Sequence, residues 1–187
     1  MRITAIIMCS GFGRRMGANK LLMPINGKRM FEYVFETIQG IGFYKTVVVT
    51  PYEEIKKYAQ IRGFEATFNS ENEEGIAASV RIGAGLCGDA EGIMYFTADQ
   101  PFIDAETINR LLFEFEKNNK ITVPVLNGKN KNPVIFPVRY KNDLLSLSGD
   151  VGGRQIINAN KADVTKVFFK IERPFIDIDT AKDFEKL

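Results

Sequence analysis

An apolar strand that runs directly into a loop of glycines and cations constrains this chain more than any other feature. Residues 3–8 (ITAIIM) form a short, mostly apolar run, which is typical of a buried strand. Residues 9–20 (CSGFGRRMGANK) follow with three glycines, two arginines and a lysine. Glycines let a backbone fold tightly with its N–H groups pointing inward, and the cations add positive charge to the same loop. Such a loop favours a ligand with several phosphates.

Composition narrows the possible chemistry. The chain has 187 residues, a net charge of +2, no histidine and two cysteines. The small net charge argues against nucleic acid or a membrane surface as partner. Without histidine, zinc catalysis and Ser-His or Cys-His mechanisms are excluded as candidates. We expect Cys9 and Cys87 to be buried, reduced thiols of a cytoplasmic protein, since the N-terminal apolar run is too short for a signal peptide.

Strand-like and helix-like segments alternate along most of the chain, which predicts one α/β domain over residues 1–187. A Rossmann-like three-layer sandwich with a mostly parallel central sheet follows from this pattern. Ligands in such sheets bind where the strands end. The expected strands cover residues 3–8, 46–50, 64–68, 92–97, 121–126, 133–137, 164–169 and 175–178. The expected helices cover residues 30–38, 53–61, 76–86, 104–117, 140–147, 155–159 and 181–187.

Two familiar phosphate loops fit the first loop poorly. Its glycine spacing loosely matches a dinucleotide-binding loop, but that interpretation needs a helix inside the loop and an acidic residue after the second strand. The second strand ends instead at Thr50-Pro51, and the Gly-Lys-Ser/Thr of a Walker loop is absent. What remains is a cradle in which Arg14, Arg15 and Lys20 neutralise a triphosphate.

The loop and the residues after it resemble the signature of the MobA-like nucleotidyltransferases, whose fold is that of the nucleotide-diphospho-sugar transferases. The version Asn-Lys-Leu-Leu-x-Pro at residues 19–24 is similar to the molybdenum cofactor cytidylyltransferases. Two departures are the Cys9-Ser10 pair, where small residues are usual, and Gly13 in place of serine. The resemblance implies that the nucleotide phosphates are held by Gly11, Gly13, Arg14, Arg15, Gly17 and Lys20, with Arg14 and Lys20 acting in catalysis.

Asp99 follows the strand at residues 92–97 and precedes Gln100-Pro101. A carboxylate at a strand end, in a turn made rigid by proline, suits a Mg²⁺ ligand facing the phosphates. Asp99-Gln100-Pro101 also resembles the metal-binding motif of the family, which makes Asp99 the strongest catalytic and metal candidate. By the same resemblance Asp179 is a second candidate ligand. Whether Asp179 or Asp177 fills that place stays open, and a helix N-cap around Asp179 and Thr180 is an alternative.

Residues 69–83 resemble the segment of the family that borders the nucleotide base and ribose. Gly75 permits close approach to a flat ring, and the hydroxyl of Ser79 offers a hydrogen bond. The resemblance makes both candidates for cytosine recognition. Without it, this segment is an ordinary loop and helix.

Two downstream segments resemble the acceptor side of the family, which we place at about residues 115–187. Asn132 stands where the family often has histidine, and residues 147–154 (LSGDVGGR) match its glycine-rich acceptor loop. Asp150, Gly152 and Arg154 are therefore expected, with Asn132, to bind an anionic pterin phosphate, for which the arginine fork is suited. A structural ion pair between Asp150 and Arg154 is the alternative.

The function implied is Mg²⁺-dependent transfer of CMP from CTP to molybdenum-bound molybdopterin, with release of pyrophosphate. A molybdenum hydroxylase is a possible client. One alternative is the same transfer with GTP or a sugar-phosphate acceptor. A second is a non-catalytic accessory protein that binds and inserts the finished cofactor, which the missing histidine at Asn132 keeps open. A dinucleotide-dependent oxidoreductase is a more distant third.

Overall fold

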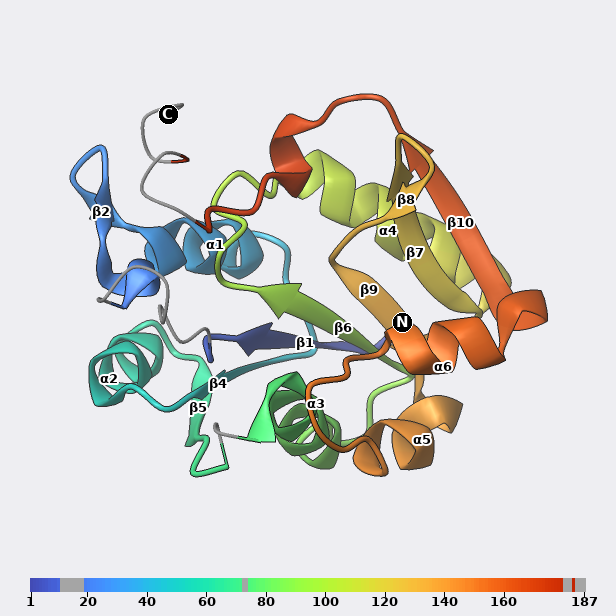
Figure 1. The fold of residues 1–187 in the computed structure, drawn as a ribbon, viewed down its shortest axis with the longest axis horizontal. Coiled ribbons are helices and arrows are strands. Elements are labelled where there is room, and N and C mark those ends of the chain that lie inside the picture. Colours follow the sequence, from blue (N-terminus) through green and yellow to red (C-terminus); the bar gives the residue numbers. More distant parts are fainter. Residues whose placement is uncertain (11–18, 72–73, 180–182, 184–187) are drawn as a thin grey trace.

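The computed structural model of the protein describes residues 1–10, 19–71, 74–179 and 183. An eight-stranded sheet runs through the described chain in the order β10-β7-β9-β6-β1-β4-β5, with β8 paired to β7 (Figure 1). Its strands are β1 Ile3–Met8, β4 Lys45–Thr50, β5 Glu65–Phe68, β6 Gly92–Thr97, β7 Ile121–Leu126, β8 Lys129–Asn130, β9 Val134–Pro137 and β10 Val164–Phe169. A separate hairpin is formed by β2 Pro24–Ile25 and β3 Lys28–Arg29.

Most of the sheet is parallel, as the sequence predicts. β1 pairs in parallel with both β4 and β6, β4 with β5, and β10 with β7. Only β9 and the short β8 run against their neighbours. The central strand β1 is buried along nearly its whole length because helices cover both faces of the sheet, and a strand in that position needs apolar residues on both sides.

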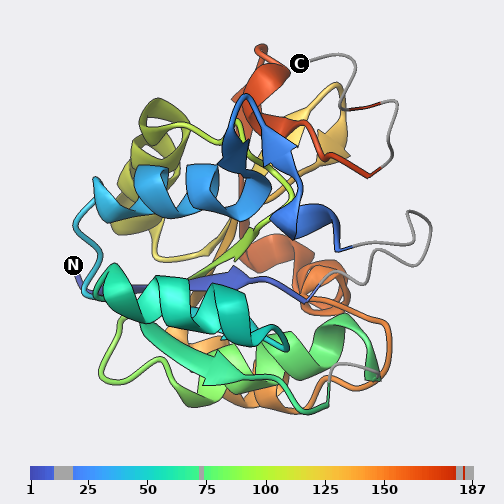
Figure 2. The same ribbon diagram turned by 90° about the vertical axis from the view of Figure 1, so that its left-hand side faces the viewer.

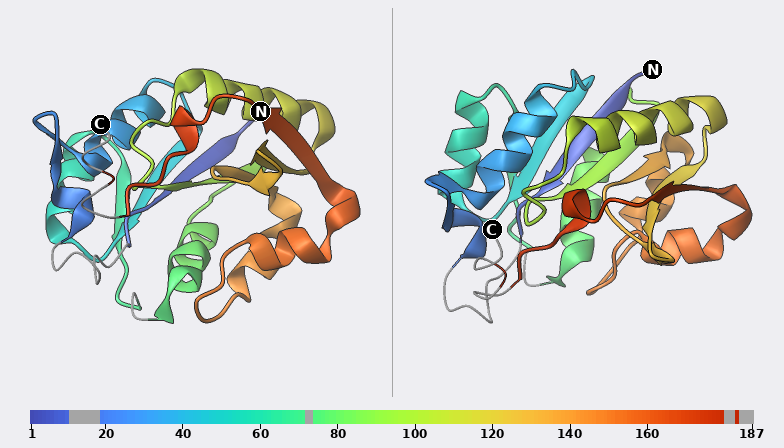
Figure 3. Two further views of the ribbon diagram at one scale, coloured as in Figure 1. Left: turned by 45° about the horizontal axis from the view of Figure 1, so that its top comes forward. Right: turned by 90° about the horizontal axis from the view of Figure 1, so that it is seen from above.

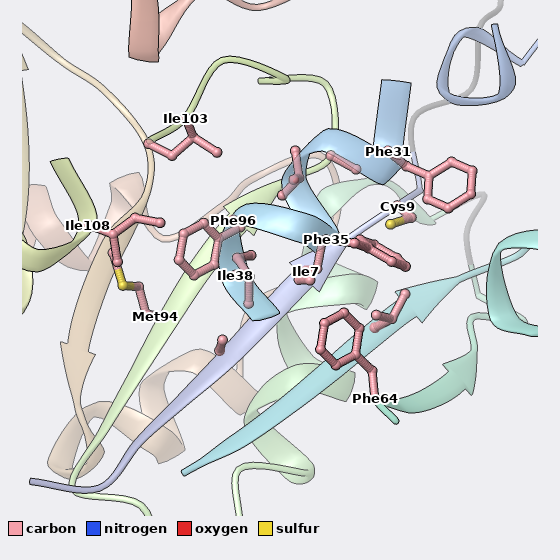
Figure 4. Close-up of a cluster of buried hydrophobic side chains, with 14 of the residues drawn as sticks. Ile7, Cys9, Phe31, Phe35, Ile38, Phe64, Met94, Phe96, Ile103 and Ile108 are labelled. Atoms are coloured by element: carbon pink, nitrogen blue, oxygen red, sulfur yellow. The ribbon is translucent and has the colours of Figure 1, made fainter. Parts of the chain in front are cut away.

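Helices form a layer on each face of the sheet (Figures 1 and 2). α1 and α4 lie on one face, and α3, α5 and α6 lie on the other, while α2 packs two buried side chains into the same core as α1. Figure 4 shows that first core, where Phe31, Phe35 and Ile38 of α1 meet Ile7 and Phe64. The helices are α1 Met30–Gln39, α2 Glu53–Ile61, α3 Ile76–Gly85, α4 Ala105–Asn118, α5 Lys141–Leu145 and α6 Arg154–Ala159.

Several local predictions are confirmed. α2 begins and ends as expected, and Asp104 caps α4 by accepting a hydrogen bond from the backbone N–H of Thr107 at 2.8 Å. Cys9 and Cys87 are buried and unpaired with each other. Within the described residues, none of the helices has the length and apolar character that crossing a membrane requires.

The predicted strand at residues 175–178 is wrong. Pro174 lies in the first positions of a short 3₁₀ turn, η5 Arg173–Phe175, and the described chain then continues to Asp179 without regular structure. One backbone bond, from the N–H of Ile178 to the carbonyl of Asp99, ties this segment to the end of β6. The predicted helix at residues 181–187 lies mostly outside the described residues.

The chain order fixes where a ligand is expected. From β1 the chain passes to β4 and β5 on one side, and later to β6 on the other side of β1. The carboxyl ends of β1 and β6 therefore flank the point where the order reverses, which is where open α/β sheets form their ligand crevice. The first loop begins at the carboxyl end of β1, and Asp99 lies two residues after the carboxyl end of β6.

Candidate active site

Lys20 reaches the carboxyl end of β6 from a short 3₁₀ turn, η1 Lys20–Leu22. Asn19 caps the turn, since its side-chain Oδ1 accepts a hydrogen bond from the N–H of Leu21 at 3.1 Å. Leu21 is fully buried in the core beneath α1 and anchors the turn. Lys20, next to the anchored Leu21, is itself buried. Its ammonium makes the polar contacts of the side chain.

Two carboxylates share the ammonium of Lys20. Its Nζ lies 2.8 Å from Oδ2 of Asp99 and 2.8 Å from Oδ1 of Asp179. Figure 3 shows the end of the described chain, in red, passing the region of η1 and the end of β6. The backbone bond between Ile178 and Asp99 holds it there. The structure thus brings together three side chains that the sequence predicts for one site, from positions 79 and 159 residues from Lys20.

The electrostatics of this cluster are set by its excess of carboxylates. Burial on its own would lower the pKa of Lys20, but the charge of Asp99 and the hydrogen bonds that Lys20 donates to both aspartates outweigh it and raise the pKa. Desolvation, followed by the charge of Asp99, raises the pKa of Asp177 above its ordinary value. Asp177 accepts a hydrogen bond from the side chain of Gln100 at 2.8 Å. Lys20 therefore stays cationic among carboxylates that repel one another.

Unsatisfied polar atoms adjoin the Lys20–Asp99 pair. The buried atoms without a hydrogen-bond partner among the described residues are Oδ1 of Asp99, Oγ1 of Thr97 and Nδ2 of Asn19. All three lie within two residues of the pair, and buried polar atoms without partners are uncommon. Among the residues described, Asp99 thus has one oxygen on Lys20 and one without a partner, which fits a carboxylate that also holds a divalent cation. Within the described residues, no three acidic, cysteine or histidine side chains converge as a complete metal cluster.

Ser79 occupies a buried hydrogen-bond network instead of presenting a free hydroxyl. Its Oγ is bonded to the hydroxyl of Ser10, at the start of the first loop, and accepts a bond from Nδ2 of Asn69 at 3.0 Å. Asn69 and Ser79 are both fully buried. The other side-chain atom of Asn69 accepts a bond from the N–H of Glu71 at 3.0 Å. Ser79 consequently links the first loop to the segment after β5.

Gly75 lies against the acceptor side of the chain. Its φ of +89° belongs to a region that side-chain-bearing residues rarely adopt. A Cβ at this position would lie 2.9 Å from Cα of Asp150 and 3.0 Å from its Oδ1. A glycine is needed here because the backbone of the acceptor loop lies so close to Gly75. The sequence alone does not reveal this contact.

The other predicted acceptor residues lie along the same edge. Arg154 begins α6 and is exposed, while Gly152 and Asn132 are half-buried. The ion pair between Asp150 and Arg154, offered as an alternative, is absent from the ion pairs among the described residues. Five predicted phosphate-binding residues lie outside the described residues, namely Gly11, Gly13, Arg14, Arg15 and Gly17.

Sequence reasoning missed the residues that support this site. Ser10 was noted only as a departure from the usual small pair, and Asn69 only as part of a motif. The signal available was that Ser10 lies two residues after β1 and Asn69 directly after β5, where the ends of parallel strands meet. Gln100 was assigned no role, although it holds Asp177.

Comparisons with known proteins identify the family of the chain. The family described as MobA-like NTP transferase domain matches residues 5–164. A probable molybdenum cofactor guanylyltransferase of Natranaerobius thermophilus is 30% identical over 142 residues, which cover 75% of this chain and 67% of that protein. The bifunctional protein GlmU of Symbiobacterium thermophilum is 30% identical over 115 residues, 59% of this chain, but the match spans only 24% of GlmU.

Solved structures share the fold at lower identity. The crystal structure of Rv0371c from Mycobacterium tuberculosis superposes with a TM-score of 0.84 at 21% identity, and covers 100% of this chain and 97% of that one. The same protein in complex with manganese superposes with a TM-score of 0.82 at 20% identity, over 100% and 97% of the two chains. At this identity the likeness establishes the fold, which matches the α/β sandwich with a mostly parallel sheet predicted from the sequence.

Proposed function

Because this chain belongs to the MobA-like NTP transferase family, we propose that it transfers CMP from CTP to molybdopterin. It is a nucleotidyltransferase of that family, and the finer assignment concerns its two substrates. The products would be the molybdopterin cytosine dinucleotide and pyrophosphate. The observation that carries the proposal is the part-buried Lys20–Asp99 pair at the carboxyl ends of β1 and β6, with one oxygen of Asp99 unpartnered among the described residues.

The chemistry asks little of a general base. A phosphate-monoester oxygen of the acceptor attacks the α-phosphorus of the nucleotide, and the bond from that phosphorus to the bridging oxygen of the β-phosphate breaks. The attacking oxygen is already anionic, so a chain without histidine can carry out the transfer. Lys20, with Arg14 and Arg15 from the first loop, is assigned to stabilise the charge that develops on the triphosphate. Each such contact is typically worth about 3–4 kcal/mol of barrier.

Mg²⁺ is the proposed cofactor, held by Asp99 and Asp179. The open oxygen of Asp99 and the exposed carboxylate of Asp179, 57% exposed in its side chain, are hard oxygen ligands of the kind that Mg²⁺ prefers. When bound, the cation would neutralise the triphosphate and favour departure of pyrophosphate. Gln100 keeps Asp177 engaged, which favours Asp179 as the second ligand.

The choice of CTP rests on the Asn19-Lys20-Leu21-Leu22 version of the first loop, which resembles the cytidylyltransferases. GTP is the second candidate, because a relative 30% identical to this chain is named a probable molybdenum cofactor guanylyltransferase. A sugar-phosphate acceptor is kept open by the match to GlmU. Gly75 and Ser79 stay assigned to the base side of the site, where Ser79 would act through its links to Ser10 and Asn69.

The acceptor is assigned to the side formed by Asn132, Asp150, Gly152 and Arg154. The exposed guanidinium of Arg154 takes part in none of the ion pairs among the described residues, and it suits the phosphate of a pterin. A molybdenum hydroxylase as client and a cytoplasmic location stay predictions from the sequence.

The test is ligand-induced thermal stabilisation followed by turnover. CTP, GTP, ATP and NADPH are compared with and without Mg²⁺, since a ligand that binds only the folded state raises Tm. We expect CTP with Mg²⁺ to give the largest shift, and CTP with molybdopterin to release pyrophosphate. A larger shift with GTP assigns the guanylyl reaction instead. Binding of the dinucleotide product without any pyrophosphate release would establish the accessory role.

A further inference from the structure

The first two turns of α3 contact the loops assigned to both substrates. Arg81, in the second turn, contacts both of these loops. We propose that Arg81 is a positioning residue that couples the nucleotide side of the site to the acceptor side. The inference rests on the proposed function for the names of the two sides. We define the base-side segment as residues 69–71 with 74–75, and the acceptor loop as residues 147–153.

Arg81 makes contacts to both segments with one guanidinium. Its Nη2 lies 2.6 Å from a carboxylate oxygen of Glu71 and 2.7 Å from one of Glu74, both in the base-side segment. Its Nη1 donates to the backbone carbonyl of Leu147, the first residue of the acceptor loop, at 2.9 Å. The planar fork of arginine can satisfy these partners at once, which the single ammonium of a lysine cannot do in the same geometry.

A backbone contact reinforces the same junction. Gly75 precedes α3 and provides no side-chain cap, so the first N–H groups of the helix need other partners. The N–H of Ala77 donates instead to the carbonyl of Gly149 in the acceptor loop at 3.3 Å. The acceptor loop therefore caps α3, and its Asp150 packs directly on Gly75.

α3 also contacts the first loop, through Ser79 on a different face of the helix. Ser79 lies two residues before Arg81 and bonds Ser10 and Asn69 in the buried network. A nucleotide that orders the base-side segment thus acts on a segment already tied to the acceptor loop. The expected consequence is that nucleotide binding restricts the acceptor loop, and that Arg81 transmits this restriction.

The position of Arg81 argues for this role over simple surface stabilisation. Its side chain is 22% exposed, whereas Glu71 and Glu74 are 51% and 55% exposed. Arg139 provides a matched comparison elsewhere in the fold. Its Nη2 also joins a backbone carbonyl, that of Asn119 at 2.7 Å, to a carboxylate, that of Asp163 at 2.6 Å. These partners of Arg139 belong neither to the base-side segment nor to the acceptor loop.

The experiment measures residue-resolved amide hydrogen exchange by NMR on the full chain, first without ligand. The reporters are the N–H groups of Glu74, bonded to the carbonyl of Glu71, and of Ala77, bonded to Gly149. In Arg81→Gln we expect both to exchange about fivefold faster or more, as expected for loss of local protection. Arg81→Lys should be intermediate. The amide of Ile7 in β1 reports whether the core stays closed, and Arg139→Gln should leave both reporters unchanged.

The second arm adds CTP or GTP with Mg²⁺. In the wild type, we expect nucleotide to slow exchange at both reporters, whereas in Arg81→Gln it should slow Glu74 and leave Ala77 unaffected. Equal slowing of Ala77 in both proteins would overturn the coupling, as would an unchanged Ala77 amide in ligand-free Arg81→Gln. If no nucleotide changes either reporter in the wild type, the proposed function fails, and the ligand-free arm still decides whether Arg81 joins the two segments.

Discussion

Two clusters of charged side chains in this molecule use the same residue types in opposite proportions. The helix cluster joins β3, α1 and α2 through ion pairs of three cations with three carboxylates, namely Lys28, Arg29 and Arg62 with Glu32, Glu36 and Glu54. In the site cluster, Asp99 and Asp179 share Lys20, and Asp177 adds a third carboxylate that feels the charges of Asp99, Asp179 and Lys131. The first cluster is balanced and the second has surplus negative charge.

This difference separates a structural arrangement from one prepared for a ligand. In the helix cluster the phenol of Tyr58 also donates to Glu32 at 2.9 Å and accepts from Arg62 at 2.7 Å, so its groups satisfy one another. In the site cluster one oxygen of Asp99 is buried with no partner among the described residues. Surplus carboxylates of this kind would attract the divalent cation proposed above, and the ammonium of Lys20 would then be available to the phosphates.

The largest expected effect comes from Asp99→Asn, which removes one of the surplus charges. We expect nucleotidyl transfer to fall by about 10²- to 10³-fold because the proposed cation loses its main ligand. Stability should change by less than about 1 kcal/mol, since Lys20 keeps Asp179 as partner. Pyrophosphate release and thermal melts measure the two quantities. Asp163→Asn, which removes an ion-paired aspartate far from the site, is the matched control.

The distinction between the site cluster and the helix cluster fails if Asp99→Asn retains more than about a tenth of the wild-type rate. It also breaks down if the variant loses several kcal/mol of stability and its residual activity tracks the folded fraction. Asp99 would then be a structural residue of the same kind as Glu32.

Lys20→Gln tests the other partner and is expected to have a somewhat smaller effect. Removal of the positive charge that Lys20 directs at the triphosphate should lower the rate by about 10²-fold. Because Lys20 competes with the cation for the two aspartates, the variant should also bind Mn²⁺ more tightly than the wild type when nucleotide is absent. Calorimetric titration with Mn²⁺ measures this, and weaker binding by the variant would contradict the competition.

The placement of Lys20 and Asp99 in one site was accessible from the sequence, because the first loop and Asp99 each follow a strand with a clear apolar pattern. Their direct ion pair was not predicted. The parallel sheet then brings the ends of β1 and β6 together without further information. Asp179 was accessible only through the family resemblance. The strand predicted around Phe175 and Ile178 was wrong because a short apolar run carries no sign of whether a neighbouring strand edge is free.

The junction between α3 and the acceptor loop was not accessible in the same way. Gly75 and Asp150 meet across 75 residues, and no periodicity marks such a contact. The two short hairpins were accessible but overlooked. Asn26-Gly27 and Asn127-Gly128 both have positive φ at both positions, which is the signature of a tight two-residue turn between strands. A glutamate such as Glu71 gave no signal that its partner would be Arg81.

Glu32→Gln tests the helix cluster and should affect stability alone. The carboxylate of Glu32 is 15% exposed and accepts hydrogen bonds from Arg29 and Tyr58. Its neutralisation should cost about 1 kcal/mol, or roughly 2–4 °C in Tm for a chain of this size. The rate of nucleotidyl transfer per folded molecule should be unchanged. A rate loss comparable to that of Lys20→Gln would mean that charge balance does not distinguish the two clusters.

The smallest expected effect is the pH dependence of that stability difference. Burial would raise the pKa of Glu32, but the hydrogen bonds from Arg29 and Tyr58 outweigh it and lower the pKa below its ordinary value of 4.5. A carboxyl with a depressed pKa contributes fully above its unfolded value and loses that contribution as pH falls through its folded value. The Tm difference between wild type and Glu32→Gln should therefore be constant near pH 7 and shrink below about pH 4.5. Thermal melts across this range measure it. A difference that persists undiminished in acid would show that the shape of Glu32, and not its charge, supports the helix cluster.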